Sequence, residues 1–171
     1  MARLIATRSA TALDRQFVED MLVEAANWDP SRPRASRDDT LRQAANARYV
    51  DGWPRESDVG VVAVDAEGEP LGAAWYRFFT AAEPGYGFVG EETPEVALAV
   101  VGEFRGQGVG GRLLTDLESA ARQRGVGALS LSVDITNPAV DLYRRHGYRE
   151  VAQRAGSYVM VLSLTVGGPE G

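Results

Sequence analysis

The sequence Glu95-Val-Ala-Leu-Ala-Val-Val-Gly-Glu-Phe-Arg-Gly-Gln-Gly-Val-Gly-Gly-Arg-Leu-Leu114 joins an apolar segment, a glycine-dense loop and the start of an amphipathic helix. Four glycines fall within six residues, namely Gly106, Gly108, Gly110 and Gly111. Because glycine tolerates positive φ and lacks a Cβ, such a loop can turn several backbone N–H groups toward one point. The unpaired first-turn amides of the helix add about half an elementary positive charge. The pattern predicts a binding site for a phosphate or pyrophosphate.

Two common phosphate-binding motifs do not account for this loop. The spacing Gly106-x-Gly108-x-x-Gly111 also satisfies the dinucleotide-binding pattern, but there the first glycine follows its strand almost at once. Here residues 102–105 intervene, and the sequence contains no Lys, which excludes the lysine-dependent P-loop. The glycines could instead serve only tight packing between strand and helix. Each interior glycine costs about 0.5–1 kcal/mol relative to alanine, however, and therefore needs a compensating use.

Composition places the chain among ordinary globular proteins. Its 171 residues, 44% hydrophobic and 25% charged, predict one domain over residues 1–165 and a loose tail over 166–171. No apolar run approaches the ~18 residues that cross a membrane, and the N-terminus lacks the apolar stretch of a signal peptide. We therefore expect a cytoplasmic protein. A net charge of -6 argues against binding to nucleic acid or to an anionic membrane.

Three absences narrow the chemistry further. The sequence has no Cys, all 18 of its basic residues are Arg, and its one histidine is His146. Cysteine nucleophiles, thiolate metal sites and lysine Schiff bases are thereby excluded. A bound metal would have to rest on carboxylates, and no spaced set of them is evident, so we expect no metal cofactor.

Hydrophobic periodicity predicts the order β-α-α-β-β-β-α-β-α-β-β. This order predicts a single α/β (α+β) domain, with a mixed, mostly antiparallel sheet of about six to seven strands and about four helices. The expected strands cover 3–8, 59–65, 71–79, 95–101, 129–133, 148–152 and 157–164, and the expected helices cover 11–28, 38–50, 108–124 and 137–147. Leu13 belongs to the apolar face of the first helix, and Asp38 or Asp39 is expected to cap the second. The glycine-rich stretch over 80–93 reads as a long loop that covers a site.

Two motifs together resemble the GNAT superfamily of acetyl-CoA-dependent N-acetyltransferases. Arg105-Gly-Gln-Gly108-Val-Gly110 matches the phosphate motif of that family, Gln/Arg-x-x-Gly-x-Gly/Ala. Asn137-Pro-Ala-Val-Asp-Leu-Tyr143-Arg-Arg-His-Gly147-Tyr148 matches its second element, an Asn followed by Leu-Tyr-x-x-x-Gly-Phe/Tyr. The resemblance covers about residues 95–148 and implies a GNAT-like domain.

The resemblance also implies residue roles in binding acetyl-CoA, which would serve as co-substrate. Asn137 would hydrogen-bond the ligand near its pantetheine end, and Tyr143 would reach the thioester sulfur. The pantetheine arm would pair with the backbone of Leu98, Ala99 and Val100, much like an added strand. The pyrophosphate would lie on the amides of Arg105, Gly106, Gln107, Gly108, Val109, Gly110 and Gly111.

Acetyl transfer to an amine needs an aligned thioester, a stabilised oxyanion, a neutral amine and a proton for the thiolate. The Val100 amide is the candidate oxyanion donor, and the Tyr143 phenol is the candidate acid. Glu95 and Glu92 are the candidate bases, since the family often uses an acidic residue in this region. Each has a plainer interpretation: Tyr143 as a core tyrosine, and the two glutamates as solvated loop charges.

Other polar and aromatic residues receive a plainer interpretation. His146 follows the end of an expected helix, where it would interact with the helix dipole. Three arginines, Arg32, Arg34 and Arg37, form either a solvated loop or a contact for an acidic acceptor. Four aromatic residues either line an acceptor pocket or belong to the core, namely Trp75, Tyr76, Tyr86 and Phe88.

The sequence thus predicts an N-acetyltransferase that acts by direct attack in a ternary complex of acetyl-CoA and an unidentified small-molecule or peptide amine. One alternative is a non-catalytic acyl-CoA sensor, and another is a nucleotide-binding module that uses the same glycines. Dimers are common in the family, so a homodimer is one assembly to test.

Overall fold

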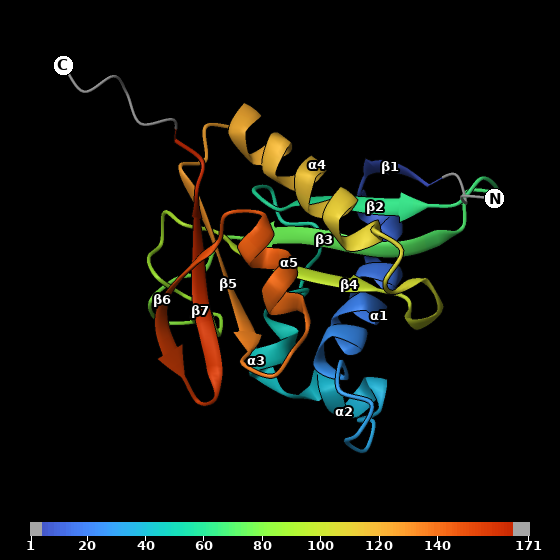
Figure 1. The fold of residues 1–171 in the computed structure, drawn as a ribbon, viewed down its shortest axis with the longest axis horizontal. Coiled ribbons are helices and arrows are strands. Elements are labelled where there is room, and N and C mark those ends of the chain that lie inside the picture. The colour runs from blue at the N-terminus through green and yellow to red at the C-terminus, as the bar shows by residue number, and fades with distance from the viewer. Residues whose placement is uncertain (1–4, 166–171) are drawn as a thin grey trace.

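The apolar segments form seven strands of one sheet, in a computed structural model that describes residues 5–165 (Figure 1). The strand order is β1-β2-β3-β4-β5-β7-β6, and only the β4–β5 pair is parallel. The strands are β1 (Ala6–Ser9), β2 (Val59–Val64), β3 (Pro70–Arg77), β4 (Glu95–Val100), β5 (Ala128–Asp134), β6 (Arg149–Arg154) and β7 (Ser157–Ser163). The tail expected over 166–171, and the first residues of the strand expected over 3–8, lie outside the described residues.

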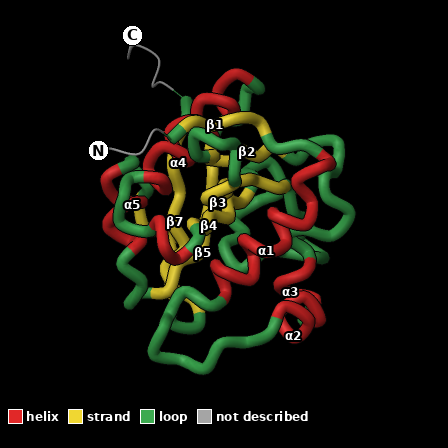
Figure 2. Tube along the Cα trace, turned by 90° about the vertical axis from the view of Figure 1, so that its right-hand side faces the viewer, coloured by secondary structure: helices red, strands yellow, loops and turns green. Residues whose placement is uncertain are grey.

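Helices cover both faces of the sheet, with α4 and α5 on one side and α1, α2 and α3 on the other (Figure 2). Their bounds are α1 (Arg15–Ala26), α2 (Arg37–Arg42), α3 (Ala44–Ala47), α4 (Val109–Gln123) and α5 (Ala139–Arg145), with 3₁₀ turns at Ala12–Asp14 and Gly102–Phe104. None of the helices in this described part of the chain has the length and apolar character that crossing a membrane requires. The predicted α/β domain with a mostly antiparallel sheet is confirmed.

Strand β4 divides its side chains between two hydrophobic cores, as expected for a strand that is apolar on both faces. Val96 and Leu98 face the core under α4 and α5, whereas Ala97 and Ala99 face the core under α1. Successive side chains of a strand point to opposite faces, so one apolar run supplies both layers. This central position places the glycine loop at the end of a strand that contributes to both cores.

The second predicted helix, over 38–50, is divided in two. Gln43 has ψ 116°, an extended conformation that separates α2 from α3. The predicted cap at Asp38 or Asp39 is wrong, because the Ser36 hydroxyl accepts the Asp39 N–H at 3.0 Å and caps α2. Serine in an extended conformation is a strong N-cap, and it begins the helix one residue earlier than expected.

The placement of Leu13 on the buried face of the first helix is also wrong. Leu13 is 97% exposed, because the chain makes a 3₁₀ turn over Ala12–Asp14 before α1 begins. A capping box formed by Thr11 and Asp14 sets this turn. The 3₁₀ turn has three residues per turn instead of 3.6, so Leu13 falls out of phase with the apolar face of α1.

A buried ion pair fastens the segment between α3 and β2 to the sheet. Arg77, at the end of β3, donates from Nε and Nη2 to the carboxylate of Asp58 at 2.9 and 2.6 Å. Its Nη1 donates to the carbonyls of Arg48 and Asp51, both at 2.8 Å. The Arg77 and Asp58 side chains are each 1% exposed, so neither charge is compensated by solvent.

We expect Asp58→Asn to lower the free energy of unfolding by roughly 3–5 kcal/mol, because it leaves the buried guanidinium without its counter-charge. Guanidinium chloride denaturation measures the change. The control is Asp39→Asn, which breaks an exposed pair with Arg42 at 3.7 Å and should change stability little. Equal, small effects of the two substitutions would contradict the prediction.

Candidate functional site

The glycine loop turns through two left-handed residues before α4 begins. Gly106 has φ +74° and Gly108 has φ +82°, and Gly108 is the N-cap of α4. Such angles disfavour any residue with a side chain. A Cβ at either position would have no heavy atom within 4 Å, so both glycines border open space. The two glycines therefore shape the loop and leave its outer side accessible.

The backbone N–H groups of residues 106–111 have no hydrogen-bond acceptor among the described residues. The first amide of the helix to find one is that of Arg112, which donates to the Gly108 carbonyl at 3.2 Å. Six successive unpaired amides at the start of a 15-residue helix can donate to an anion. Residues 106–111 are therefore the candidate site for a phosphate or pyrophosphate.

The other two glycines of the loop serve packing. A Cβ at Gly110 would lie 3.2 Å from Leu142 of α5 and 3.7 Å from Leu98 of β4. A Cβ at Gly111 would lie 3.7 Å from His146 Nε2. The alternative interpretation of the glycines, tight packing, thus accounts for Gly110 and Gly111 but not for the left-handed pair.

The long side chains of the loop bind within the protein. Arg105 donates from Nε to the Val100 carbonyl at 3.3 Å and lies 3.5 Å from Glu24 of α1. Gln107 donates to the Glu103 carbonyl at 3.2 Å. The Arg105 N–H also donates to the Gly102 carbonyl, at 3.4 Å, so the expected contact of the Arg105 amide with the pyrophosphate is not available in this structure. Of these two residues, Gln107 alone has a backbone N–H without an acceptor in the described part of the chain.

Strands β4 and β5 diverge immediately after they meet. They pair only at Glu95 and Ser130, where the Ser130 N–H donates to the Pro94 carbonyl at 3.0 Å. Beyond that point β4 pairs only with β3, and β5 pairs with β7 along its whole length (Figure 1). The sheet therefore opens on the β5 side of β4.

The hydrogen-bonding direction alternates along β4, so the register shows which residues face this opening. The Val101 N–H donates to Leu71 beyond the end of β3, which assigns Ala99 to the β3 side. Leu98 and Val100 consequently direct their N–H and C=O groups toward the opening. Of the three residues expected to pair with pantetheine, Leu98 and Val100 therefore have backbone groups that point toward the opening, whereas the backbone groups of Ala99 point toward β3.

Helix α5 brings the second motif to the same opening. The Asn137 side-chain oxygen accepts the Ala139 N–H at 2.9 Å, so Asn137 satisfies the first amide of the helix. Leu142 lies against Gly110, and Tyr143 belongs to the same hydrophobic core as Val96 of β4 and Val109 of α4. The two motifs are thus adjacent in space.

Tyr143 is 7% exposed and packs edge-on against Tyr148 at 5.7 Å between ring centres. Burial raises the pKa of its phenol, which therefore stays protonated. No hydrogen bond to its hydroxyl forms among residues 5–165. The phenol is consequently available as a proton donor.

Glu95 begins β4 and is 2% exposed, on the face opposite Tyr143. Its Oε1 accepts the Tyr49 hydroxyl and the Gly87 N–H, the latter at 2.8 Å, while Oε2 is buried without a partner in the described structure. Burial raises the pKa of Glu95 to about 7, against the opposing effect of the hydrogen bonds from Tyr49 and Gly87 and of the Arg154 charge. A carboxyl group with this pKa can exchange protons near neutral pH.

The other candidate base lies elsewhere. Glu92 is exposed in the loop before β4, and the structure gives it no hydrogen bond or ion pair with the described residues. Tyr49, which orients Glu95, was not among the sequence candidates. Nothing local could have indicated it, since 46 residues separate it from Glu95.

The remaining candidates have structural roles. His146 Nδ1 lies 3.0 Å from Glu118, whose pKa burial raises, and the pair joins α5 to α4. Trp75 and Tyr76 are 1% exposed on opposite faces of β3, Phe88 is partly buried in the α1-side core, and Tyr86 is 51% exposed. The loop arginines pair with nearby carboxylates: Arg32 with Asp29, Arg34 with Glu24, and Arg37 with Glu19 and Asp20.

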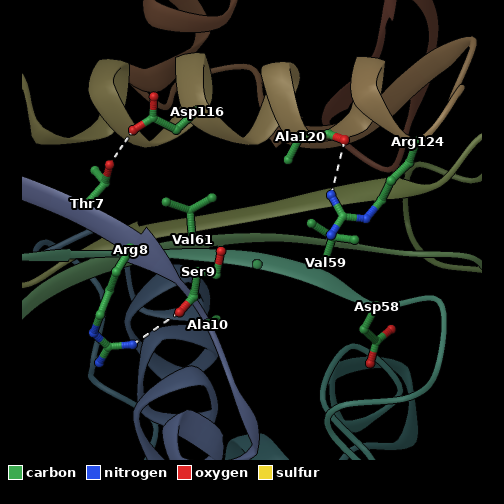
Figure 3. Close-up of a pocket in the computed structure, with 11 residues that line it drawn as sticks. Thr7, Arg8, Ser9, Ala10, Asp58, Val59, Val61, Asp116, Ala120 and Arg124 are labelled. Carbon is green, nitrogen blue, oxygen red and sulfur yellow. Dashed lines mark hydrogen bonds between the residues drawn. The ribbon is translucent and has the colours of Figure 1, made fainter.

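Two cavities lie away from the candidate site formed by Glu95, Tyr143 and the glycine loop. One, of about 310 Å³, lies between β1, β2 and α4, where Thr7 donates to Asp116 and Arg124 donates to the Ala120 carbonyl (Figure 3). The other, of about 540 Å³, lies between α1 and residues 34–37 and reaches Val101 at the end of β4. Neither is lined by Glu95 or Tyr143, so geometry and chemistry, rather than cavity size, define the candidate site.

Comparison with known proteins identifies a family whose sequence model matches this chain and solved structures with the same fold. The sequence model of the acetyltransferase (GNAT) family matches residues 20–148. No curated protein matches the chain. Similar solved structures include an N-acetyltransferase of Staphylococcus aureus (18% identity, 95% of this chain and 99% of that chain, TM-score 0.69). A ribosomal-protein-alanine N-acetyltransferase of Brucella melitensis (23%, 92% and 99%, 0.63) and the PaiA N-acetyltransferase of Thermoplasma acidophilum, solved with coenzyme A (14%, 94% and 99%, 0.65), share the fold as well.

Proposed function

The chain belongs to the acetyltransferase (GNAT) family, and on this premise we propose that it transfers an acetyl group from acetyl-CoA to a primary amine by direct attack in a ternary complex. One observation carries the proposal. The opening between β4 and β5 begins beside the buried carboxyl group of Glu95 and runs toward the unpaired amides of residues 106–111.

The residues around this opening fit acetyl-CoA. The amides of residues 106–111 suit a pyrophosphate, and the backbone N–H and C=O groups of Leu98 suit the amides of a pantetheine arm, whereas the Val100 carbonyl already accepts Arg105 Nε. Coenzyme A in the Thermoplasma neighbour supports the same ligand class. The Asn137 carboxamide has its oxygen engaged by the first amide of α5, which leaves its N–H₂ group to donate to the ligand.

Two groups act on the thioester in this proposal. The Val100 N–H polarises the carbonyl and stabilises the oxyanion as the amine nitrogen bonds to the carbonyl carbon. The Tyr143 phenol donates to the sulfur as the carbon–sulfur bond breaks. A phenol is a weaker acid than a thiol in water, and burial raises the pKa of both, so the phenol acts through its hydrogen bond to the sulfur, which strengthens as negative charge develops there while the carbon–sulfur bond breaks.

Glu95 removes the proton that the amine must lose. Its carboxylate lies on the α1 side of the sheet, whereas Tyr143 lies in the core under α4 and α5. The opening joins the two faces, so thioester and amine approach each other from opposite sides. Burial distinguishes Glu95 from the exposed Glu92 and supports Glu95 as the base.

The acyl-CoA sensor remains the second candidate, because residues 84–88 cover the Glu95 carboxyl group in this structure. Calorimetry with acetyl-CoA and with NAD, and thiol release across a panel of amines, separate the candidates. Binding and turnover support the transferase. Binding without turnover on any amine supports the sensor, and a preference for NAD over acetyl-CoA contradicts both.

We expect Tyr143→Phe to lower kcat by about 10²-fold while the affinity for coenzyme A changes little, because the phenol is required only as the thiolate departs. Thiol-release kinetics and calorimetry measure the two quantities. Tyr158→Phe is the matched control, since Tyr158 lies on β7 and contacts Arg144. If kcat is undiminished in Tyr143→Phe, the phenol is not the acid, and Tyr143 is only a packed residue of the core.

A further inference from the structure

A short segment, residues 84–88, lies directly over the carboxyl group of Glu95. Within it the Gly87 N–H donates to Glu95 Oε1 at 2.8 Å, and the Tyr86 N–H donates to the Tyr49 hydroxyl oxygen at 2.8 Å. Three further bonds hold the segment: Arg48 to the Pro84 carbonyl, the Tyr86 hydroxyl to Asn46 at 2.9 Å, and Arg154 to the Phe88 carbonyl at 2.9 Å. The segment is thus tied to elements on both sides of the opening.

Glycine is required for this close approach. A Cβ at Gly85 would overlap Glu95 Oε2 and would lie 2.8 Å from the Tyr49 hydroxyl oxygen. A Cβ at Gly87 would lie 2.5 Å from the backbone of Leu131 on β5. With the segment in place, Gly85 blocks the one carboxylate oxygen that has no hydrogen-bond partner in the described structure.

Tyr49 is itself held in one position. It is 5% exposed, with its ring 5.0 Å from Phe79 and 6.1 Å from Tyr86 between centres. Its carbonyl accepts the Trp75 indole N–H at 3.1 Å. Because its oxygen already accepts the Tyr86 N–H, the hydroxyl proton is directed to Glu95 Oε1.

We infer that Tyr49 is a positioning residue for Glu95, and that residues 84–88 must lift from the carboxyl group before an acceptor amine reaches Oε2. The inference rests on the proposed role of Glu95 as base. Tyr49 and Gly87 saturate Oε1, which leaves Oε2 as the oxygen that receives the amine proton. A buried acceptor without a donor is unfavourable, and the N–H of an amine supplies that donor.

The groups around Glu95 determine whether a substitution raises or lowers the pKa of its carboxyl group. The hydrogen bonds from Tyr49 and Gly87 and the Arg154 charge lower the pKa of Glu95, whereas burial raises it more strongly. The other ionisable groups near this site are Tyr86, in the segment itself, Arg48, which donates to the Pro84 carbonyl, and Arg77, opposite Glu95 on β3 and paired with Asp58. Removal of the Tyr49 hydroxyl therefore raises the pKa of Glu95. Removal of the cover breaks the Gly87 hydrogen bond, which raises the pKa, but it also admits water to the carboxylate, which lowers it; because burial is the larger of the two effects, we expect the pKa to fall.

The test follows the side-chain carboxyl carbon of Glu95 by NMR against pH, in full-length protein labelled with ¹³C-glutamate and without substrate. Glu95→Gln assigns the signal. Tyr49→Phe should raise the midpoint by about one pH unit, the equivalent of one hydrogen bond to a charged group. Gly85→Ala should lower it toward the ordinary value of 4.5, because the added methyl displaces residues 84–88 and hydrates the carboxylate. Tyr158→Phe, which removes a hydroxyl on β7 away from Glu95, is the matched control and should leave the midpoint in place.

Opposite shifts in Tyr49→Phe and Gly85→Ala support the inference, and an unshifted midpoint in both overturns it. If Tyr49→Phe does not fold, Gly85→Ala still tests the cover, and Tyr49→Met tests the loss of the hydroxyl. In kinetics, Tyr49→Phe should shift the acidic limb of the pH profile of kcat/KM for the amine to higher pH, without changing the KM for acetyl-CoA. A wild type that acetylates amines, with a profile that Tyr49→Phe leaves unchanged, refutes the positioning role only. A wild type without turnover refutes the proposed function, while the NMR midpoints still report on the cover.

Discussion

Glu95→Gln should lower kcat about 10²- to 10³-fold at pH 8 and leave the affinity for coenzyme A almost unchanged, because only proton removal from the amine is lost. In the wild type, kcat/KM for the amine, which reports the ionisation of the free enzyme, should rise with pH along a limb centred at about 7, where Glu95 loses its proton. The substitution should abolish that limb. Steady-state kinetics from pH 5.5 to pH 9 follow both effects, in a range chosen around the pKa of about 7.

Glu91→Gln is the control for the lost negative charge, since Glu91 is exposed in the same loop. Glu92→Gln separates the two candidate bases. A large loss of kcat in Glu92→Gln alone would transfer the role of base to Glu92 and contradict the assignment to Glu95.

The raised pKa of Glu95 also makes the free energy of unfolding depend on pH. Its pKa rises from 4.5 to about 7 on folding, so the folded state binds the proton more tightly than the unfolded state. The resulting stabilisation is complete below pH 4.5 and is lost as pH rises through about 7, a change of roughly 3 kcal/mol. Denaturation at pH 5 and pH 8 should show this loss in the wild type and not in Glu95→Gln.

Gly108→Val should weaken coenzyme A binding by roughly tenfold to a hundredfold, the equivalent of the strain of a β-branched residue in the left-handed region. Gly108 has φ +82° and borders open space, so the valine side chain both strains the loop and projects where a phosphate would lie. Calorimetry measures the dissociation constant. In kinetics the KM for acetyl-CoA should rise more than kcat falls.

Gly102→Val provides a matched glycine control. Gly102 lies in the 3₁₀ turn between β4 and the loop, its φ is not in the left-handed region, and a Cβ there would have no neighbour within 4 Å. The control should bind coenzyme A like the wild type. If Gly102→Val and Gly108→Val bind equally well, the left-handed turn is not part of the anion site.

Local patterns were sufficient to predict the central part of the fold. The apolar run of β4, the left-handed glycines and the amphipathic helix α4 each depend on residues close together in the chain. Their predicted bounds consequently agree with the structure to within one or two residues. The same patterns failed at two places where a turn or a cap interrupts the helical period. One is the break after Arg42, and the other is the 3₁₀ turn that leaves Leu13 exposed.

By itself the sequence determined the succession of strands and helices along the chain, the anion-binding loop and the second motif at Asn137 and Tyr143, because hydrophobic period and glycine placement act over a few residues. Only the tertiary structure decided which carboxylate is buried. Glu95 and Glu92 are three residues apart and chemically alike, yet Tyr49 and residues 84–88 enclose one and leave the other exposed. Desolvation and hydrogen bonding, which separate the two glutamates, depend on contacts between segments that are distant in the chain.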